Sequence, residues 1–198
     1  MSNIGKSYLA TRLVSEKGFE RIGCDDLVET AIGDELKQLG YSGVNDVGRW
    51  MGQPYTANYS RNSAKFIECE RAVMLDIIAR LKLQKANNPL VIDTSGSVIY
   101  VGEDVIQELK TLSKIVYLEA SELHREKLFK LYIDEPKPVV WGESYSRLPG
   151  ESDFDSLART YPLLLNYRTE QYKRHADLTI PYETHRGMDL DFLLKELS

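Results

Sequence analysis

Short apolar runs alternate with longer segments of helical spacing along the chain. Four short runs predict strands at 19–24, 89–93, 114–119 and 178–181. Apolar residues that recur every three or four positions predict helices at 7–17, 26–39, 60–83, 105–112, 122–131, 154–175 and 188–197. Strands that alternate with helices indicate a parallel sheet with helices on both faces, so we expect a three-layer α/β/α fold.

Glycine and proline predict where the regular elements stop. Gly40 is expected to end the helix over 26–39, and Pro162 to interrupt the helix over 154–175. The stretch over about 41–60 is typical of an irregular or short-helical lobe above a substrate site, and the loop-like stretch over about 130–153 is typical of a lid. With 198 residues and 42% apolar content, we expect one domain over 1–198.

The first seven residues carry most of a phosphate-binding loop. Met-Ser-Asn-Ile-Gly-Lys-Ser fits seven of the eight positions of the pattern Gly, four residues, Gly-Lys-Ser/Thr. Gly5 allows close approach of backbone to phosphate, Lys6 can reach the β- and γ-phosphates, and the hydroxyl of Ser7 can bind Mg²⁺. The nucleotide-binding residues expected from this pattern are Asn3, Ile4, Gly5, Lys6, Ser7 and Tyr8. A Gly-Lys-Ser that begins a helix by chance is the alternative.

The glycine that opens this pattern would stand one position before Met1, after a buried strand. Either the protein begins upstream of Met1, or the chain has lost its central strand. We favour an upstream start, because loss of a central strand leaves backbone groups unpaired on both neighbouring strands. The fold expected is therefore an α/β/α fold of the P-loop type, with its first strand missing from this sequence.

Composition narrows the classes of partner. The net charge of −5 argues against nucleic acid as the main partner, because domains that bind phosphate backbones are usually basic. Two cysteines suit a reducing compartment, and no apolar run approaches the length of a membrane span. We expect a cytoplasmic protein that binds no nucleic acid and no membrane, as a monomer or small homo-oligomer.

Two aspartates follow predicted strands. In open α/β sheets, ligands bind at the carboxyl ends of the strands, where Asp25 and Asp93 are expected. Asp93 is a candidate to hold Mg²⁺ together with Ser7, or else it caps the turn that begins at Thr94. Asp25 is a candidate substrate contact or base, or else a helix cap.

The order of elements and several local patterns resemble the shikimate kinase family of small P-loop kinases. Gly23-Cys-Asp-Asp-Leu-Val-Glu resembles the family's Asp-x-Asp segment, with Gly23 in place of the first aspartate. By resemblance, Asp25 contacts the hydroxyls of the substrate and is the candidate base. Phe66 and Glu70 match the family's Phe-Arg-x-x-Glu pattern, but Ile67 replaces the arginine that grips the substrate carboxylate. Unless Arg61 or Arg71 takes over, shikimate itself is not the expected acceptor.

The resemblance extends into the second half of the chain. Ser95-Gly96-Ser97 stands at the family's glycine triplet, and Lys137-Pro-Val-Val stands at its Arg-Pro-Leu-Leu lid segment. The run from Arg168 to Asp177 matches the family's Arg-x-x-x-Tyr-x-x-x-Ala-Asp at every specified position. The resemblance implies that Lys137 supplies a cation to the moving phosphate and that Gly96, Glu70 and Arg168 contact the substrate.

Together these features indicate ATP-dependent phosphoryl transfer, with Mg²⁺, to a hydroxyl of a small metabolite. Lys6, Asp25 and Lys137 are the candidate catalytic residues, and Ser7 and Asp93 the candidate metal ligands. A nucleoside or nucleotide kinase is the alternative enzyme. A nucleotide-binding regulatory module without turnover is the alternative of a different class.

Overall fold

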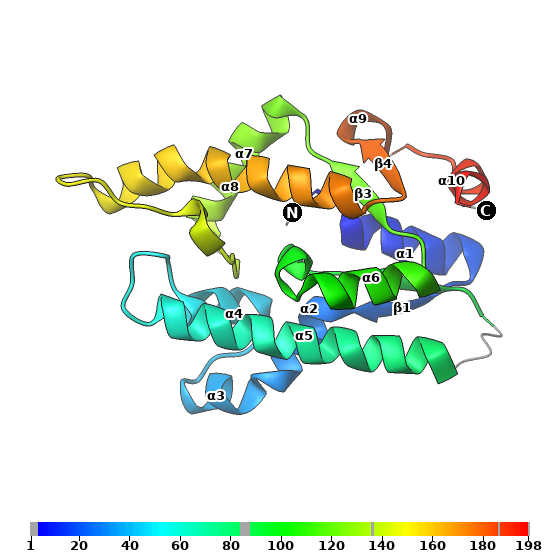
Figure 1. Cartoon of the computed structure of the whole chain (residues 1–198), viewed down its shortest axis with the longest axis horizontal. Helices are drawn as coiled ribbons and strands as arrows, with labels where there is room; N and C mark the ends of the chain where they lie inside the picture. Colours follow the sequence, from blue (N-terminus) through cyan, green and yellow to red (C-terminus); the bar gives the residue numbers. More distant parts are fainter. Residues whose placement is uncertain (1–3, 84–87, 136, 186, 198) are drawn as a thin grey trace.

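The computed structural model describes residues 4–83, 88–135, 137–185 and 187–197. In these residues helices surround four short strands (Figure 1). The elements in chain order are α1 Lys6–Lys17, β1 Glu20–Gly23, α2 Cys24–Ala31, α3 Gly33–Gln38, α4 Val44–Met51, α5 Tyr59–Leu83, β2 Leu90–Asp93, η1 Val98–Tyr100, α6 Glu103–Leu112, β3 Val116–Glu119, α7 Glu122–Asp134, η2 Gly142–Ser144, α8 Asp153–His175, β4 Leu178–Pro181, α9 Tyr182–His185 and α10 Leu190–Glu196.

The strands form two parallel sheets of two strands each within the described residues. In the first sheet, β1 pairs with β2 over four residue pairs, from Glu20–Leu90 to Gly23–Asp93. In the second, β3 pairs with β4 from Val116–Leu178 to Glu119–Pro181. All pairing is parallel, as the alternation of strands and helices predicts.

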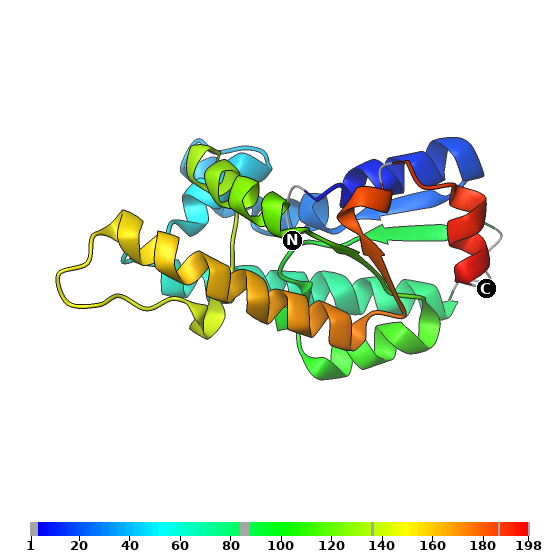
Figure 2. The ribbon, with the colours of Figure 1, turned by 90° about the horizontal axis from the view of Figure 1, so that it is seen from above.

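Helices cover both faces of this strand layer. Figure 2 shows α1 on one side of the strands and α5 and α6 on the other. Contacts of α1 with β1 and β2, of α5 with α6, and of α8 with β3 fix the layers. The predicted α/β/α layering is confirmed, with the strand layer divided into two sheets.

Two predicted helix boundaries are wrong. The segment predicted as one helix over 26–39 divides at Ile32, whose φ of −97° and ψ of 5° leave helical geometry. This break buries both Ile32 and Leu36. The interruption expected at Pro162 is absent, because α8 runs unbroken from Asp153 to His175. Tyr161 and Leu164 are buried beside Pro162, and this packing offsets the backbone hydrogen bond that proline cannot make.

An aromatic cluster anchors the stretch that precedes α8. Trp141 is fully buried, and its ring packs edge-on against Tyr132 of α7, Tyr145 and Tyr161 of α8. Its indole N–H donates to the hydroxyl of Tyr132 at 3.2 Å. The stretch over 137–152 is therefore held at one point by a large buried side chain.

None of the helices in the described ranges combines the length and apolar character that a membrane span requires.

Candidate functional site

The chain enters α1 through a backbone conformation that requires glycine. Gly5 has a φ of 96°, in the left-handed region, and its carbonyl accepts the first helical hydrogen bond from the amide of Leu9 at 3.0 Å. A Cβ atom at this position would lie 2.7 Å from Nε2 of the buried His185 on α9. The first-turn amides of a helix have no partner inside the helix, so this end suits an anion.

The predicted nucleotide-binding residues lie at this turn as far as the structure describes them. Asn3 lies outside the described residues. Ile4 is buried, Lys6 is half-buried, and Ser7 and Tyr8 are exposed. The main-chain carbonyl of Ser7 accepts a hydrogen bond from the hydroxyl of Thr11. This contact does not involve the side-chain hydroxyl of Ser7.

Lys6 is the centre of a group of charged residues from five parts of the chain. Burial lowers the pKa of its ammonium, while the charges of Asp25 and Asp93 act to raise it and those of Arg168 and Lys137 act to lower it. These four neighbours were each singled out from separate sequence segments. The fold brings them within electrostatic range of one lysine.

Asp25 lies in the first turn of α2, immediately after β1 ends at Gly23. More than a third of the residue is exposed, yet desolvation by the surrounding protein raises the pKa of its carboxyl. Lys6 opposes this increase, and Asp93 adds to it. A carboxylate with a raised pKa beside a cation is suited to accept a proton from a hydroxyl.

Asp93 ends β2 and forms an ion pair with Arg21, a residue that belongs to no sequence motif. Nη2 and Nε of Arg21 lie 2.7 Å and 3.3 Å from Oδ2 of Asp93. The pairing raises the pKa of the Arg21 guanidinium. Parallel register places Arg21 opposite Val91, and each lies two residues before the last residue of its strand. The sequence signal that could have indicated Arg21 is a charged residue within a short predicted strand.

Glu70 of α5 is fully buried and is held by two serines. Its carboxylate accepts hydrogen bonds from the hydroxyl of Ser95 and, at 2.6 Å, from that of Ser97. Burial raises the pKa of Glu70 to about 7, although both hydrogen bonds act to lower it. Gly96 lies between the two serines, and its carbonyl accepts from the hydroxyl of Tyr172 at 2.5 Å. The predicted contacts Glu70 and Gly96 therefore belong to one buried polar network.

Arg168 of α8 is a buried cation beside this network. Only 4% of the residue is exposed, and its Nη2 donates to the carbonyl of Val140 at 2.8 Å. The guanidinium carbon lies 5.8 Å from the centre of the Tyr100 ring. Its Nε has no hydrogen-bond partner among the described residues. A buried guanidinium with donor capacity to spare is suited to an anionic ligand.

Lys137 begins the stretch that leads through Trp141 to η2. It is half-buried, and its charge acts on both Lys6 and Asp25. The same stretch supplies the carbonyl of Val140 to Arg168. The predicted lid therefore contacts the group of charges at its start.

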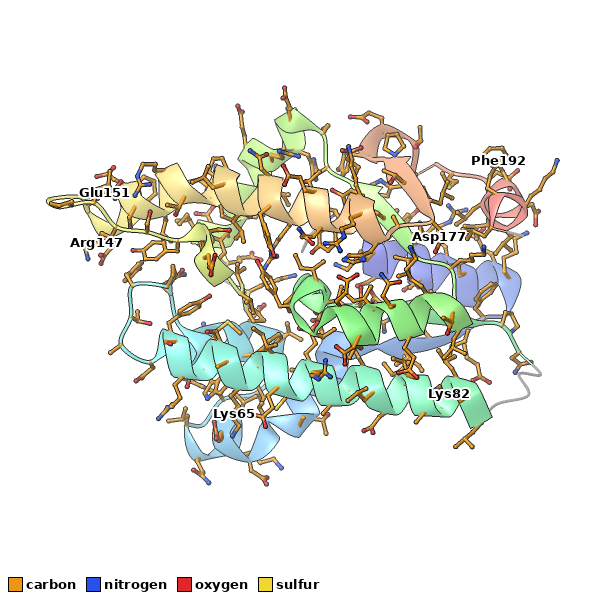
Figure 3. All side chains as sticks on the ribbon, viewed as in Figure 1. Lys65, Lys82, Arg147, Glu151, Asp177 and Phe192 are labelled. Carbon is orange, nitrogen blue, oxygen red and sulfur yellow. The ribbon has the colours of Figure 1, made fainter. Side chains whose placement is uncertain are left out.

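The far end of this stretch is tied to α8 by surface ion pairs. Figure 3 shows Arg147 and Glu151 at the tip, away from the strands. Nε of Arg159 lies 2.7 Å from Oε1 of Glu151, and Nη1 of Arg147 lies 2.8 Å from Oδ1 of Asp153. The hydrogen bond from Arg159 lowers the pKa of Glu151 to about 2.

Neither Arg61 nor Arg71 replaces the guanidinium that is missing at position 67. Arg71 donates to both carboxylate oxygens of Asp104 on α6 and to the carbonyl of Val101. Arg61 donates from Nε to the side chain of the neighbouring Asn62. Ile67 itself packs against the hydrophobic core. Arg168 is therefore the buried guanidinium that the described fold offers at this site.

The described residues of the site include no cluster of protein metal ligands. No group of three or more histidine, cysteine, aspartate or glutamate side chains in the described ranges could hold a metal ion. A cation here would depend on few protein oxygens and on the ligand, as Mg²⁺ commonly does at phosphate sites.

Comparison with solved structures identifies the fold. No protein-family profile matches the sequence, and no curated protein matches it. The structure is similar to shikimate kinase from Bacteroides thetaiotaomicron, with a TM-score of 0.54 and 17% identity over 99% of this chain and 89% of that one. It is also similar to shikimate kinase from Aquifex aeolicus vf5, with a TM-score of 0.52 and 15% identity over 97% and 89%. The chain therefore has the fold of a shikimate kinase-like P-loop kinase.

Proposed function

We propose that the chain transfers the γ-phosphoryl group of ATP to a hydroxyl group of a small anionic metabolite. The observation that carries this proposal is the meeting of Lys6, Asp25, Asp93, Arg168 and Lys137 at the start of α1. Phosphoryl transfer needs positioned charge more than covalent chemistry, and this group supplies cations and a candidate base together. The similarity to two shikimate kinases supports the same reaction class.

Each charged residue has a distinct proposed role. The first-turn amides of α1 and the ammonium of Lys6 bind the β- and γ-phosphates. Lys137, on the lid stretch, neutralises charge on the transferring group. Asp25 orients the acceptor hydroxyl and takes its proton, which its raised pKa favours.

The residues at the turn fit a magnesium nucleotide. Ser7 offers an exposed hydroxyl, and Asp93 retains Oδ1 beside the Oδ2 that contacts Arg21. Hard oxygen donors are those that Mg²⁺ prefers. When bound, Mg²⁺ would offset the negative charge of the phosphates, and Ser7 and Asp93 are the residues that would hold it.

The acceptor is expected to carry one anionic group. Arg168 would bind that group through the donor capacity that Val140 leaves open, while Glu70 and the Gly96 backbone shape the adjoining wall. Shikimate is disfavoured, because Ile67 replaces a guanidinium and Arg71 is held by Asp104.

A panel of acceptors tests this proposal. ADP release would be measured with Mg-ATP and hydroxylated acids, with the corresponding neutral alcohols, and with nucleosides. Release that depends on a hydroxy acid and falls at least tenfold with its neutral analogue supports the proposal. Turnover with nucleosides alone would assign a nucleoside kinase instead.

A second candidate is a nucleotide-binding module without turnover. The Arg21–Asp93 ion pair favours it, because the guanidinium occupies one oxygen of the proposed metal carboxylate. Binding of Mg-ATP without ADP release for any acceptor in the panel would support this candidate. If Arg21→Ala then gains turnover, the ion pair is the cause of the inactivity.

A further inference from the structure

Tyr100 of η1 carries a buried hydroxyl group that has no hydrogen-bond partner among the described residues. Burial raises the pKa of this phenol, so the group keeps its hydrogen at neutral pH and remains a donor. Buried hydroxyl groups normally have a partner, because burial without one costs free energy. The hydroxyl of Tyr100 is therefore a candidate to contact a ligand rather than to support the fold.

Arg168 of α8 lies beside the same ring and cannot accept the hydrogen of this hydroxyl. The guanidinium carbon is 5.8 Å from the ring centre, and its charge acts to lower the pKa of Tyr100. A guanidinium carries donors and no acceptor, so the phenolic hydrogen needs another partner. Nε of Arg168 is itself a buried donor without a partner in the described part of the chain. Two neighbouring side chains therefore have buried donor capacity to spare.

The hydrogen-bond acceptors around Arg168 are already engaged. The carbonyl of Val140 accepts from Nη2 of Arg168 at 2.8 Å. The carbonyl of Gly96 accepts from Tyr172, whose phenol interacts electrostatically with Arg168. The carboxylate of Glu70, on which the charge of Arg168 also acts, accepts from two serines. A bound molecule that carries acceptor oxygens would match the two spare donors.

The stretch over 137–152 contacts both side chains. Gly142 has a φ of 56°, in the left-handed region, and a Cβ atom there would lie 3.1 Å from Cε1 of Tyr100 and 3.5 Å from its hydroxyl oxygen. The main chain at Gly142 thus runs close to the hydroxyl edge of the ring. The same stretch supplies the carbonyl of Val140 to Arg168. Both donors therefore lie where this stretch meets the candidate site.

We propose that Tyr100 is a substrate-binding residue, whose hydroxyl donates to the same anionic group of the metabolite that Arg168 binds. The inference rests on the proposed function, because it names a second contact for that group. Donors from two separate elements suit a carboxylate, whose two oxygens can each accept a hydrogen bond. A neutral analogue would leave the buried donors without an anionic partner, so the pair would select for the acid.

Tyr100→Phe tests this role, because it removes only the hydroxyl. The ring keeps its place beside Arg168 and its stack with Tyr167, whose ring centre is 6.0 Å away. Binding of D-glycerate and D-gluconate, with glycerol and sorbitol as neutral analogues, is measured by calorimetry without nucleotide. Tyr145→Phe is the matched control, because the hydroxyl of Tyr145 hydrogen-bonds with that of Ser156 at 3.0 Å. The Tm of each variant and ADP release with Mg-ATP are measured separately.

Tyr100→Phe is expected to weaken binding of an acid about tenfold or more, the worth of one hydrogen bond to a charged group. It should leave binding of the neutral analogues unchanged and keep the Tm at or above that of the wild-type chain, because the hydroxyl has no partner in the free fold. Tyr145→Phe should lower the Tm and leave binding of the acid unchanged.

Three results would overturn the proposal. They are equal affinity of Tyr100→Phe and the wild-type chain for the acids, no binding of either acid to the wild-type chain, and a Tm that falls in Tyr100→Phe as it does in Tyr145→Phe. The last result would assign the hydroxyl to the fold. Binding of an acid that depends on the Tyr100 hydroxyl, without ADP release, would support the role of Tyr100 and contradict the proposed phosphoryl transfer.

Discussion

Glu70 offers a direct test of the buried polar network. Its negative charge lowers the stability of the fold, and glutamine has nearly the same shape without that charge. The substitution Glu70→Gln removes the ionisable group and retains an oxygen that accepts from one serine. The new amide group can donate to the hydroxyl oxygen of the other serine. Ser95 and Ser97 thus keep their hydrogen bonds, and only the charge is lost.

The magnitude and sign follow from the two pKa values. The pKa of Glu70 is about 7 in the fold, against an ordinary value of 4.5. Between these values the folded state holds a proton that the unfolded state has released, so stability falls as pH rises from about 4.5 to about 7. The total decrease in the free energy of unfolding is about 3 kcal/mol, and it is complete above about pH 7.

Glu70→Gln should therefore match the wild-type chain at pH 4.5 and exceed its stability at pH 8 by about 3 kcal/mol, or about 6–12 °C in Tm. Urea unfolding at both pH values measures the difference. Glu68→Gln is the matched control, because Glu68 lies on the same helix and is exposed. A Glu70→Gln variant that gained no stability between pH 4.5 and pH 8 would refute the reasoning.

Three further substitutions have defined outcomes. Arg168→Met should lower kcat/KM for an anionic acceptor about 10- to 100-fold, the worth of one charged hydrogen bond, and should spare a neutral acceptor. Trp141→Ala should lower the free energy of unfolding by about 3–5 kcal/mol, measured by urea titration, because it empties a fully buried aromatic site. Glu151→Gln should speed tryptic cleavage after Arg147 several-fold, because it removes the negative charge and one of the two carboxylate oxygens that accept from Arg159 at the tip.

Controls make these outcomes specific. Lys173→Met, on the same helix as Arg168 but paired with Glu119, should leave the acceptor preference unchanged. Glu143 lies in the same stretch over 137–152 as Glu151, and Glu143→Gln should not alter tryptic cleavage after Arg147. Equal losses with anionic and neutral acceptors would contradict the role of Arg168. A Trp141→Ala variant as stable as the wild-type chain would contradict the anchoring role of the indole.

The sequence predicts the elements of this fold well because burial dictates their spacing. The apolar face of the helix predicted over 60–83 matches α5, and the run ending in Asp93 matches β2. Pro162 shows where local rules fail, since tertiary packing on both sides keeps α8 intact. The break at Ile32 likewise depends on which residues find room in the core, which local propensity does not encode.

Much of the candidate site could also be predicted, because strand ends and a helix start in this fold converge on one place. Lys6, Asp25 and Asp93 come from three such points and interact in the structure. Arg21 and His185 were missed, since neither belongs to a pattern. The ion pair of Arg21 depends on strand register, and the contact of His185 with Gly5 depends on where α9 packs. Such pairings between distant segments follow only from the assembled fold.

The most direct test of the phosphate-binding turn is the affinity of Mg-ATP for the wild-type chain and for Lys6→Ala, measured by titration calorimetry. Lys17→Ala is the control, because Lys17 lies on the same helix and pairs with Asp191. Saturable binding that Lys6→Ala weakens at least tenfold, and that Lys17→Ala leaves unchanged, is the predicted result. Equal affinity in Lys6→Ala and the wild-type chain, or no binding to the wild-type chain, would contradict the account.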